Sequence, residues 1–416
     1  MTARDVIKKD DVVIKFVGDS GDGMQLTGTL FSDTSALDGN DIATFPDYPA
    51  EIRAPHNTVA GVSGFQVHIG KQIYSSGDKA DVLVAMNPAS LKANLKWAKA
   101  GGIIIVDADT FEEGAIEKAG YSSNPLEDDS LSNYKLIKAP ITSFTIEAVK
   151  EIFTDRKAAL KCRNMFALGM IFFIFGKELD HTYAYLEKKF AKKPEVIQAN
   201  KEVIRAGYNF CDNTDVMEYQ MQVETATMPA GRYRNITGNI ATAWGLLAAA
   251  EKAGLPLFLG SYPITPATDI LIELAKHKSL GARVFQAEDE IAGICSAIGA
   301  SFAGAMACTS TSGPGLSLKS EAIGLAVMTE LPLVIVDVQR AGPSTGIPTK
   351  TEQTDLNQAL YGRNGECPMV VMAAHSPAGC FDAAFNAAKI ALEHMTPVLL
   401  LTEGFLGNGS EPWLIP

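Results

Sequence analysis

The sequence predicts an α/β protein built from two doubly wound parallel-sheet domains. Apolar runs typical of buried strands alternate with helical stretches through almost the whole chain, which is the pattern of parallel α/β architecture. At 416 residues the chain is too long for a single core. A polar stretch without periodicity separates two such series, so we expect an N-terminal domain over 1–211, a linker over 212–234 and a C-terminal domain over 235–416.

The N-terminal series opens with a strand at 12–18, a glycine turn and a helix from Met24 to about Leu37. The runs VLVAMNP and GIIIVDAD predict two further buried strands, each ending in polar or turn residues. The expected positions are strands at 82–88 and 102–109, followed by helices near 158–178 and 194–210.

The C-terminal series begins with a helix over 238–253 and a strand over 256–260. Ligands of open α/β sheets bind where strands end and loops lead into helices, so the loops after the strands are the informative ones. Further strands are predicted at 283–286, 305–309, 333–338, 369–373 and 397–402.

Composition and charge exclude several classes of protein. The formal net charge of −12 argues against a nucleic-acid partner, which requires clustered Lys and Arg. The most apolar run, over 165–175, is far shorter than the roughly 20 residues that a bilayer requires, and it predicts a core helix. The six cysteines are widely spaced without a CxxC pair, so neither a zinc site nor an iron–sulfur cluster held by this chain alone is expected. We expect a cytoplasmic protein without membrane contact and without its own metal.

A glycine loop, GDSGDG, links the first strand to the first helix and contains Gly18, Gly21 and Gly23. Its backbone N–H groups and the helix N-terminus suit a phosphate. The order G-x-x-G-x-G differs from the G-x-G-x-x-G of dinucleotide sites. A structural turn and an anion site both stay open.

In the C-terminal domain, SYPITPAT at 261–268 follows a buried strand. Thr265 as N-cap and Pro266 at the first helical position would form a preferred helix start. Pro263 stiffens the approach and fixes how Tyr262 and Thr265 are presented. The sequence leaves open whether Thr265 only begins a helix or also contacts a ligand.

Two further segments suit a bound ligand. Glu290 precedes a helix rich in Gly, Ala and Ser, where a carboxylate can hydrogen-bond a heterocyclic nitrogen, although acids at helix N-termini are also ordinary. The turn TSTSGPG, with Gly313 and Gly315, lets a ligand approach the backbone, or is simply a tight, capped turn.

Arg340 stands at the end of an apolar strand, where a guanidinium can bind a carboxylate in bidentate fashion. The loop beyond it, AGPSTGIPTKTEQTDL, is too long and too rich in Gly, Pro and Thr to be only a connector. A plain surface arginine remains the alternative.

Together, the YPITP run, the Glu290 helix, the TSTSGPG turn and QRAGPSTGIPTKTEQTDL resemble the α subunit of 2-oxoacid:ferredoxin oxidoreductases. Residues 10–210 resemble the γ domain of that family, fused ahead of the α domain as in its 2-oxoglutarate branch. The resemblance implies a γ-like first domain and a second domain that binds the pyrimidine half of thiamine diphosphate.

The resemblance also implies roles for individual residues. Glu290 resembles the glutamate that contacts the aminopyrimidine ring and promotes its imino tautomer. Thr265 and Arg340 resemble a substrate-binding threonine and the arginine that binds the 2-oxoacid carboxylate. Thr349 resembles a nearby substrate contact, and Lys350 is a candidate for a distal carboxylate. The expected cofactor-binding positions are Tyr262, Pro263, Ile264, Glu290, Gly313 and Gly315.

The implied activity is oxidative decarboxylation of 2-oxoglutarate with coenzyme A, yielding succinyl-CoA and CO2, with electrons passed to ferredoxin. Gly18, Gly21 and Gly23 are possible coenzyme A contacts. The alternatives are a pyruvate or other 2-oxoacid enzyme, an NAD(P)-binding dehydrogenase built on the glycine loop, and a non-catalytic subunit.

The resemblance further implies a partner. Thiamine enzymes hold Mg²⁺ and diphosphate with GDG followed, after a fixed interval, by Asn; here Gly21-Asp22-Gly23 is followed too soon by Asn40 and too late by Asn57. We therefore expect Mg²⁺ and a [4Fe-4S] cluster on a separate β subunit, in an (αβ)2 assembly. The family's α subunit usually continues with a further domain, and the chain stops about where that domain would begin.

Overall fold

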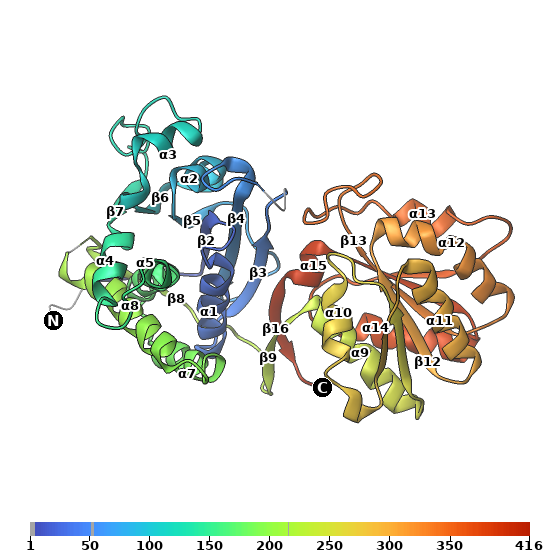
Figure 1. Ribbon diagram of the computed structural model, residues 1–416. Helices are drawn as coiled ribbons and strands as arrows, with labels where there is room; N and C mark the ends of the chain where they lie inside the picture. The colour runs from blue at the N-terminus through green and yellow to red at the C-terminus, as the bar shows by residue number, and fades with distance from the viewer. Residues whose placement is uncertain (1–4, 51–53, 215) are drawn as a thin grey trace. The chain divides into compact units, whose positions relative to one another are not determined.

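The computed structural model describes residues 5–50, 54–214 and 216–416. The chain forms two compact units that divide between Gly231 and Arg232, called here the N-terminal and C-terminal units. Each unit contains a six-stranded sheet with helices on both faces, which confirms two doubly wound α/β domains (Figure 1).

The sheet of the N-terminal unit has the strand order β3-β4-β2-β5-β6-β7. Only β4 runs against its neighbours, so this sheet is mixed and not wholly parallel as predicted. The strands β3 and β4 lie in a stretch for which the sequence analysis predicted no strand. The strands are β2 (Asp11–Asp19), β3 (Asp41–Asp47), β4 (Val62–Gly70), β5 (Ala80–Ala85), β6 (Ala98–Asp107) and β7 (Lys135–Ala139).

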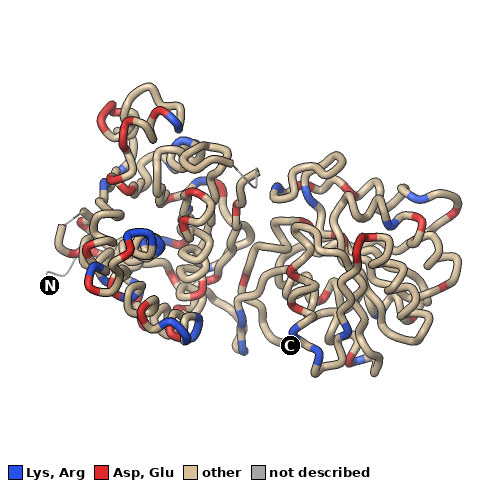
Figure 2. Tube along the Cα trace, in the orientation of Figure 1, with Lys and Arg blue, Asp and Glu red and all other residues tan. Residues whose placement is uncertain are grey.

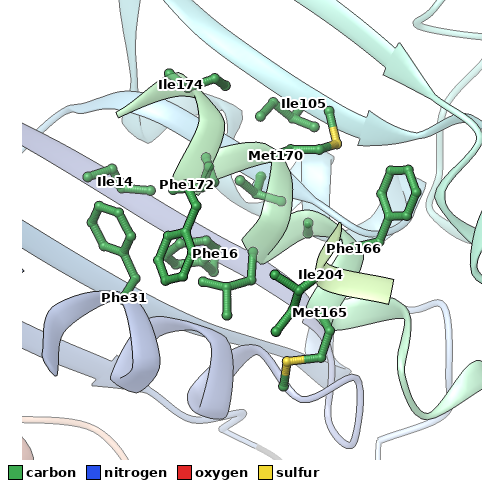
Figure 3. Packing of buried hydrophobic residues seen from close by; sticks show 14 of the residues in the cluster. Ile14, Phe16, Phe31, Ile105, Met165, Phe166, Met170, Phe172, Ile174 and Ile204 are labelled. Atoms are coloured by element: carbon green, nitrogen blue, oxygen red, sulfur yellow. The ribbon is translucent and has the colours of Figure 1, made fainter. Parts of the chain in front are cut away.

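Alternation along the strands produces two cores in this unit. Ile14 and Phe16 of β2 face a large core with α1 (Met24–Leu37), α6 (Arg163–Ile174) and α8 (Pro194–Asn213), as Figure 3 shows for part of it. Val17 faces the opposite core, under α2 (Pro88–Asn94) and α3 (Glu113–Lys118). The other helices are α4 (Ile141–Ala148), α5 (Arg156–Leu160) and α7 (Asp180–Lys189).

The apolar run at 165–175 is a core helix, as expected, because α6 is buried from Asn164 through Ile174. No helix in the described part of the chain is long and apolar enough to cross a membrane. Figure 2 shows positively and negatively charged residues distributed over the N-terminal unit.

The stretch predicted to be a linker contains regular structure. Within 212–234, β8 (Tyr219–Val223) pairs in parallel with β1 (Asp5–Lys9), which ties this segment to the N-terminal unit. The sequence analysis missed β8 because the β1–β8 pair is short and largely exposed. An exposed strand lacks the alternation of apolar residues that predicts a strand.

The sheet of the C-terminal unit is wholly parallel, in the order β11-β10-β12-β13-β15-β14. Its strands lie within two residues of the predicted positions. They are β10 (Leu257–Ser261), β11 (Arg283–Gln286), β12 (Met306–Thr311), β13 (Leu333–Gln339), β14 (Val370–Ala373) and β15 (Pro397–Glu403). A separate antiparallel pair joins β9 (Tyr233–Thr237) to β16 (Ser410–Leu414).

Helices cover both faces of this sheet. On one face, α9 (Gly238–Ala253), α10 (Thr268–Leu274) and α14 (Gly379–His394) enclose one core. On the other, α11 (Glu290–Phe302) and α12 (Gly313–Met328) enclose a second. Two short helices, α13 (Leu356–Tyr361) and α15 (Gly404–Asn408), complete the unit. Because all six strands are parallel, the loops after β10, β11, β12 and β13 meet at one edge of the sheet.

Candidate functional site

The loop after β10 does not form the helix start that the sequence predicted. The helix α10 begins at Thr268 with Ala267 as its N-cap, so Thr265 is not an N-cap and Pro266 is not the first helical residue. The N–H of Ala267 closes a separate turn on the carbonyl oxygen of Ile264, at 2.8 Å. The carbonyl of Thr265 instead accepts a hydrogen bond from Arg340, which sequence periodicity cannot reveal.

Arg340 directly follows β13 and is only 5% exposed. Its Nη1 donates to the main-chain oxygen of Thr265 and its Nη2 to that of Thr345, each at 2.8 Å. Burial lowers the pKa of Arg340, and the charges of Asp355 and Glu290 oppose this shift. Both hydrogen bonds go to neutral carbonyls, so the guanidinium keeps its positive charge for a ligand.

A cavity of about 740 Å³ opens beside Arg340. This volume lies within the range of small-molecule sites. The wall combines the N-terminal turn of α12 with the loop after β13. The lining residues are Gly313, Pro314, Ser317, Leu318, Arg340, Ala341, Gly342, Pro343, Ser344, Thr345, Glu352, Thr354, Asp355 and Gln358.

Thr349 and Lys350 lie half-buried in the same loop. The carbonyl oxygen of Lys350 accepts a hydrogen bond from the N–H of Ala341, the residue after Arg340, at 2.9 Å. The N–H of Lys350 in turn donates to Ile347 at 3.1 Å. These bonds fold the loop back onto the end of β13, close to the guanidinium.

Glu290 is the first residue of α11, and its side chain is partly exposed. The helix is capped by Asp289, whose carboxylate accepts from the N–H of Ala292 at 2.7 Å. A Cβ atom added to Gly315 would lie 2.8 Å from Cγ of Glu290 and 2.0 Å from Oγ1 of Thr311. Glycine is therefore required for α12 to lie against the Glu290 side chain.

Lys319 is a site residue that the sequence analysis missed. It is fully buried, and its Nζ donates to the main-chain oxygen of Glu290 at 2.8 Å. Burial lowers the pKa of Lys319 to about 8, while the charges of Glu290 and Asp289 act in the opposite direction. The available signal was its spacing, because Lys319 stands one helical turn after Gly315 on an otherwise apolar, small-residue face.

Two carboxyl groups also lie at this edge of the sheet. Asp337 of β13 is fully buried, and burial together with the negative charge of Asp355 raises its pKa well above the ordinary value. Burial also raises the pKa of Asp355, against a hydrogen bond from Thr354. A Cβ atom on Gly313 would lie 2.7 Å from Oδ1 of Asp355, so Asp355 packs on the start of α12.

The remaining predicted cofactor positions lie in the loop after β10. Tyr262 is 38% exposed, whereas Pro263 and Ile264 are half-buried. Ile264 packs against the core under α9 and α10. The structure thus brings Thr265 and Arg340 into contact and places Glu290 against Gly315, whereas Tyr262 is exposed.

An apolar surface extends from Glu290 along α11 and α12. Apart from Glu290, α11 contains no charged residue. Phe302 and Met328 are 84% and 79% exposed. This α11–α12 face consists of Ile291, Cys295, Phe302, Leu318, Leu325 and Met328, all exposed.

The side chain of Asp22 folds back onto the glycine loop at 18–23. The carboxylate of Asp22 accepts from the N–H of Asp19 at 2.9 Å and pairs with Arg163 at 2.5 Å. Gly21 and Gly23 have positive φ angles of 103° and 81°, which a tight turn requires. This geometry favours the structural turn, and coenzyme A contact by Gly18, Gly21 or Gly23 stays a prediction. Within the described ranges, no group of three or more His, Cys, Asp or Glu is arranged to hold a metal ion.

Two family models match the chain. Residues 13–210 match the model described as pyruvate ferredoxin/flavodoxin oxidoreductase. Residues 249–416 match the thiamine-diphosphate-binding model of pyruvate flavodoxin/ferredoxin oxidoreductase.

Among curated proteins, the chain is 54% identical over 415 residues to the 2-oxoglutarate oxidoreductase subunit KorA of Mycobacterium tuberculosis, covering 100% of this chain and 64% of that protein. It is 27% identical to the 2-oxoacid:ferredoxin oxidoreductase 2 subunit alpha of Aeropyrum pernix, covering 96% of this chain and 66% of that protein.

Among solved structures, the chain is similar to the 2-oxoglutarate:ferredoxin oxidoreductase from Magnetococcus marinus with 2-oxoglutarate, coenzyme A and succinyl-CoA bound. The TM-score is 0.82 at 31% identity, covering 98% of this chain and 66% of that chain. The sequence thus spans slightly less than two thirds of the length of these relatives.

Proposed function

Because the chain belongs to the 2-oxoacid:ferredoxin oxidoreductase family, we propose that it is the α subunit of a thiamine-diphosphate-dependent 2-oxoglutarate:ferredoxin oxidoreductase. The reaction converts 2-oxoglutarate and coenzyme A into succinyl-CoA and CO2, and passes two electrons to two ferredoxins. One observation carries the proposal: a buried guanidinium, held by the Thr265 carbonyl, stands at the wall of a cavity large enough for a small organic acid.

Arg340 binds the carboxylate next to the 2-oxo group. Its position is fixed by two main-chain carbonyls from different loops, so little rotamer entropy is lost when substrate binds. The hydroxyl of Thr265 is exposed at the same edge and is available to hydrogen-bond the substrate. These two residues orient the substrate.

The residues around Glu290 fit the aminopyrimidine half of thiamine diphosphate. Gly315 leaves room beside the Glu290 side chain, and the carboxylate lies at the partly exposed start of an uncharged helix face. When bound, the cofactor supplies the electron sink for decarboxylation. Glu290 holds a proton at a ring nitrogen, and Tyr262, Pro263, Ile264 and Gly313 complete the surroundings.

The α11–α12 face supports a partner subunit. A group of exposed apolar side chains close to Glu290 is typical of a protein–protein interface. We assign it to a β subunit that carries Mg²⁺, the diphosphate half of the cofactor site and a [4Fe-4S] cluster. The assembly is then (αβ)2, it reduces ferredoxin, and it is cytoplasmic.

Substrate choice among 2-oxoacids depends on a second cation. Lys350 is our candidate for the distal carboxylate of 2-oxoglutarate, because its loop folds back beside Arg340. Thr349 is the proposed neighbouring contact. The relative at 54% identity is named for 2-oxoglutarate, whereas the family models are named for pyruvate, so a pyruvate enzyme is the second candidate.

The test is reconstitution. The chain is co-expressed with its proposed β subunit, and ferredoxin reduction is followed with coenzyme A and either 2-oxoglutarate or pyruvate. We expect an iron–sulfur chromophore and thiamine diphosphate to co-purify, and turnover to be at least tenfold faster on 2-oxoglutarate. Equal rates on both acids would overturn the substrate choice. NAD(P)H binding by the isolated chain, or no turnover on any 2-oxoacid, would overturn the enzyme assignment.

A further inference from the structure

The most unusual buried charge of the C-terminal unit is Lys319 on α12. Its side chain is fully buried, although lysine is almost never found so without a partner. Its Nζ donates to the main-chain oxygen of Glu290, 29 residues earlier, at 2.8 Å. A charge-assisted hydrogen bond of this kind stabilises more than a neutral one.

Lys319 and Gly315 act on the same residue from one face of α12. They are four positions apart, so they lie on successive turns of that face. Gly315 leaves the space that the Glu290 side chain occupies, while Lys319 binds the carbonyl of Glu290. We call these two residues the Glu290 seat. The seat contacts the first turn of α11 from the buried side. The exposed Asp289 caps the same turn.

The ammonium of Lys319 is also electrostatically coupled to Glu290. The charged and titratable groups that face it are Glu290, Asp289 and Cys295, and each raises the pKa of Lys319 against the effect of burial. Asp289 and Glu290 are the N-cap and first residue of α11, and Cys295 lies on the following turn. The positive charge is therefore balanced mainly by the residue that we place against the cofactor.

We propose that Lys319 is a positioning residue for Glu290, whose buried ammonium holds the start of α11 so that the Glu290 carboxylate is presented in one orientation. The functional consequence rests on the proposed function of Glu290. The coupling itself is a property of this chain alone, so it can be measured without cofactor or partner.

The first experiment follows the thermal unfolding midpoint from pH 7 to pH 10.5 for the wild type, Lys319→Met and the control Lys278→Met, which alters an exposed lysine. The pKa of Lys319 is about 8 when folded and 10.5 ordinarily. Below pH 8 the group is protonated in both states and the penalty of burying it is constant. Above pH 8 the folded chain loses the proton first, so stability rises toward pH 10.5.

We therefore expect the unfolding midpoint of the wild type to rise relative to that of Lys319→Met between pH 8 and pH 10.5. The midpoint of Lys278→Met should rise in parallel with that of the wild type, because this control retains Lys319. In the Glu290→Gln background the rise in the midpoint should begin at lower pH. The negative charge of Glu290 helps Lys319 to keep its proton, and this substitution removes that charge. Parallel curves for the wild type and Lys319→Met, or a rise that begins at an unchanged pH in the Glu290→Gln background, would overturn the coupling.

The second experiment uses the assembled enzyme. Lys319→Met should lower kcat at least tenfold while KM for the 2-oxoacid stays within twofold, because a small displacement of a catalytic group costs rate and not substrate affinity. Lys319→Gln keeps a donor for the Glu290 carbonyl without the charge and should recover part of kcat. If Lys319→Met fails to fold, Lys319→Gln alone carries the comparison.

Unchanged kcat in Lys319→Met or Lys319→Gln would overturn the positioning role even if the unfolding data show the coupling. An inactive wild-type assembly would instead overturn the proposed function, and the unfolding data would still decide whether Lys319 and Glu290 are coupled.

Discussion

Nη1 of Arg340 lies 2.8 Å from the carbonyl oxygen of Thr265, 75 residues earlier in the chain. This bond joins the loops after β13 and β10, which belong to strands separated in the sheet by β12. Arg340 and Thr265, the two residues that we propose as substrate contacts, are thus parts of one hydrogen-bonded unit, and each depends on the position of the other.

Substituting Arg340 by Lys keeps the positive charge but should still weaken substrate binding, because the forked guanidinium is lost. A single ammonium cannot hold the carbonyls of Thr265 and Thr345 and still present a fork to a carboxylate. We expect KM for the 2-oxoacid to rise at least about tenfold, measured by steady-state ferredoxin reduction. The exposed Arg283→Lys is the matched control. A KM within twofold of the wild type would contradict the assignment of Arg340 to the substrate carboxylate.

Substituting Glu290 by Gln should abolish proton transfer at the cofactor while keeping the shape of the side chain. General acid–base groups contribute about 10²–10⁴-fold to rate, so kcat should fall by at least about 100-fold. Size-exclusion chromatography should show an intact assembly, and Glu288→Gln, an exposed neighbour, should behave like the wild type. Normal turnover by Glu290→Gln would favour a non-catalytic subunit.

Two glycines of α12 provide a matched comparison of packing. In Gly315→Ala the new methyl group would collide with Oγ1 of Thr311 and crowd Cγ of Glu290. In Gly324→Ala nothing lies within 4 Å of the added atom. We expect Gly324→Ala to stabilise the chain by about 0.5–1 kcal/mol, as alanine does within a helix.

Gly315→Ala should instead lower the free energy of unfolding by about 1–3 kcal/mol, because overpacking displaces neighbours, and it should reduce turnover. Chemical denaturation of both variants measures the difference. Equal stabilisation by the two substitutions would show that α12 does not lie against Glu290 as described.

Asp337→Asn should reveal the buried carboxyl through its pH dependence. The pKa of Asp337 is raised well above its usual value by burial and by Asp355, so the folded chain holds a proton that the unfolded chain releases near the ordinary pKa of 3.8. The contribution of the protonated Asp337 to stability is fully present below pH 3.8. It declines as the pH rises toward the pKa of Asp337 in the folded chain.

Asn resembles the protonated acid and does not titrate. At pH 4, the free energy of unfolding of Asp337→Asn should lie within about 1 kcal/mol of the wild-type value. Between pH 4 and pH 8, the stability of Asp337→Asn relative to the wild type should increase. Denaturant titrations at pH 4, 6 and 8 measure this trend. The opposite slope would mean that Asp337 is ionised in the folded chain.

Much of the fold follows from local patterns. The helices predicted at Met24–Leu37 and at 238–253 have those bounds in the structure, and the predicted strand at 283–286 is β11. The bounds of the two helices follow local turn chemistry, because Gly23 directly precedes α1 and Gly254 directly follows α9. By contrast, β3 and β4 were missed and β4 runs antiparallel, since strand direction depends on partners that are distant in sequence.

The sequence by itself determined the two α/β units and pointed to Thr265, Glu290 and Arg340 as candidate site residues, because motif spacing and strand ends are local properties. Tertiary structure decided how these residues are used. Thr265 lies two residues before the N-cap of α10, and its carbonyl accepts a hydrogen bond from Arg340. Lys319, inconspicuous within an apolar helix, lies beneath Glu290 only because α11 and α12 pack side by side against one face of the sheet.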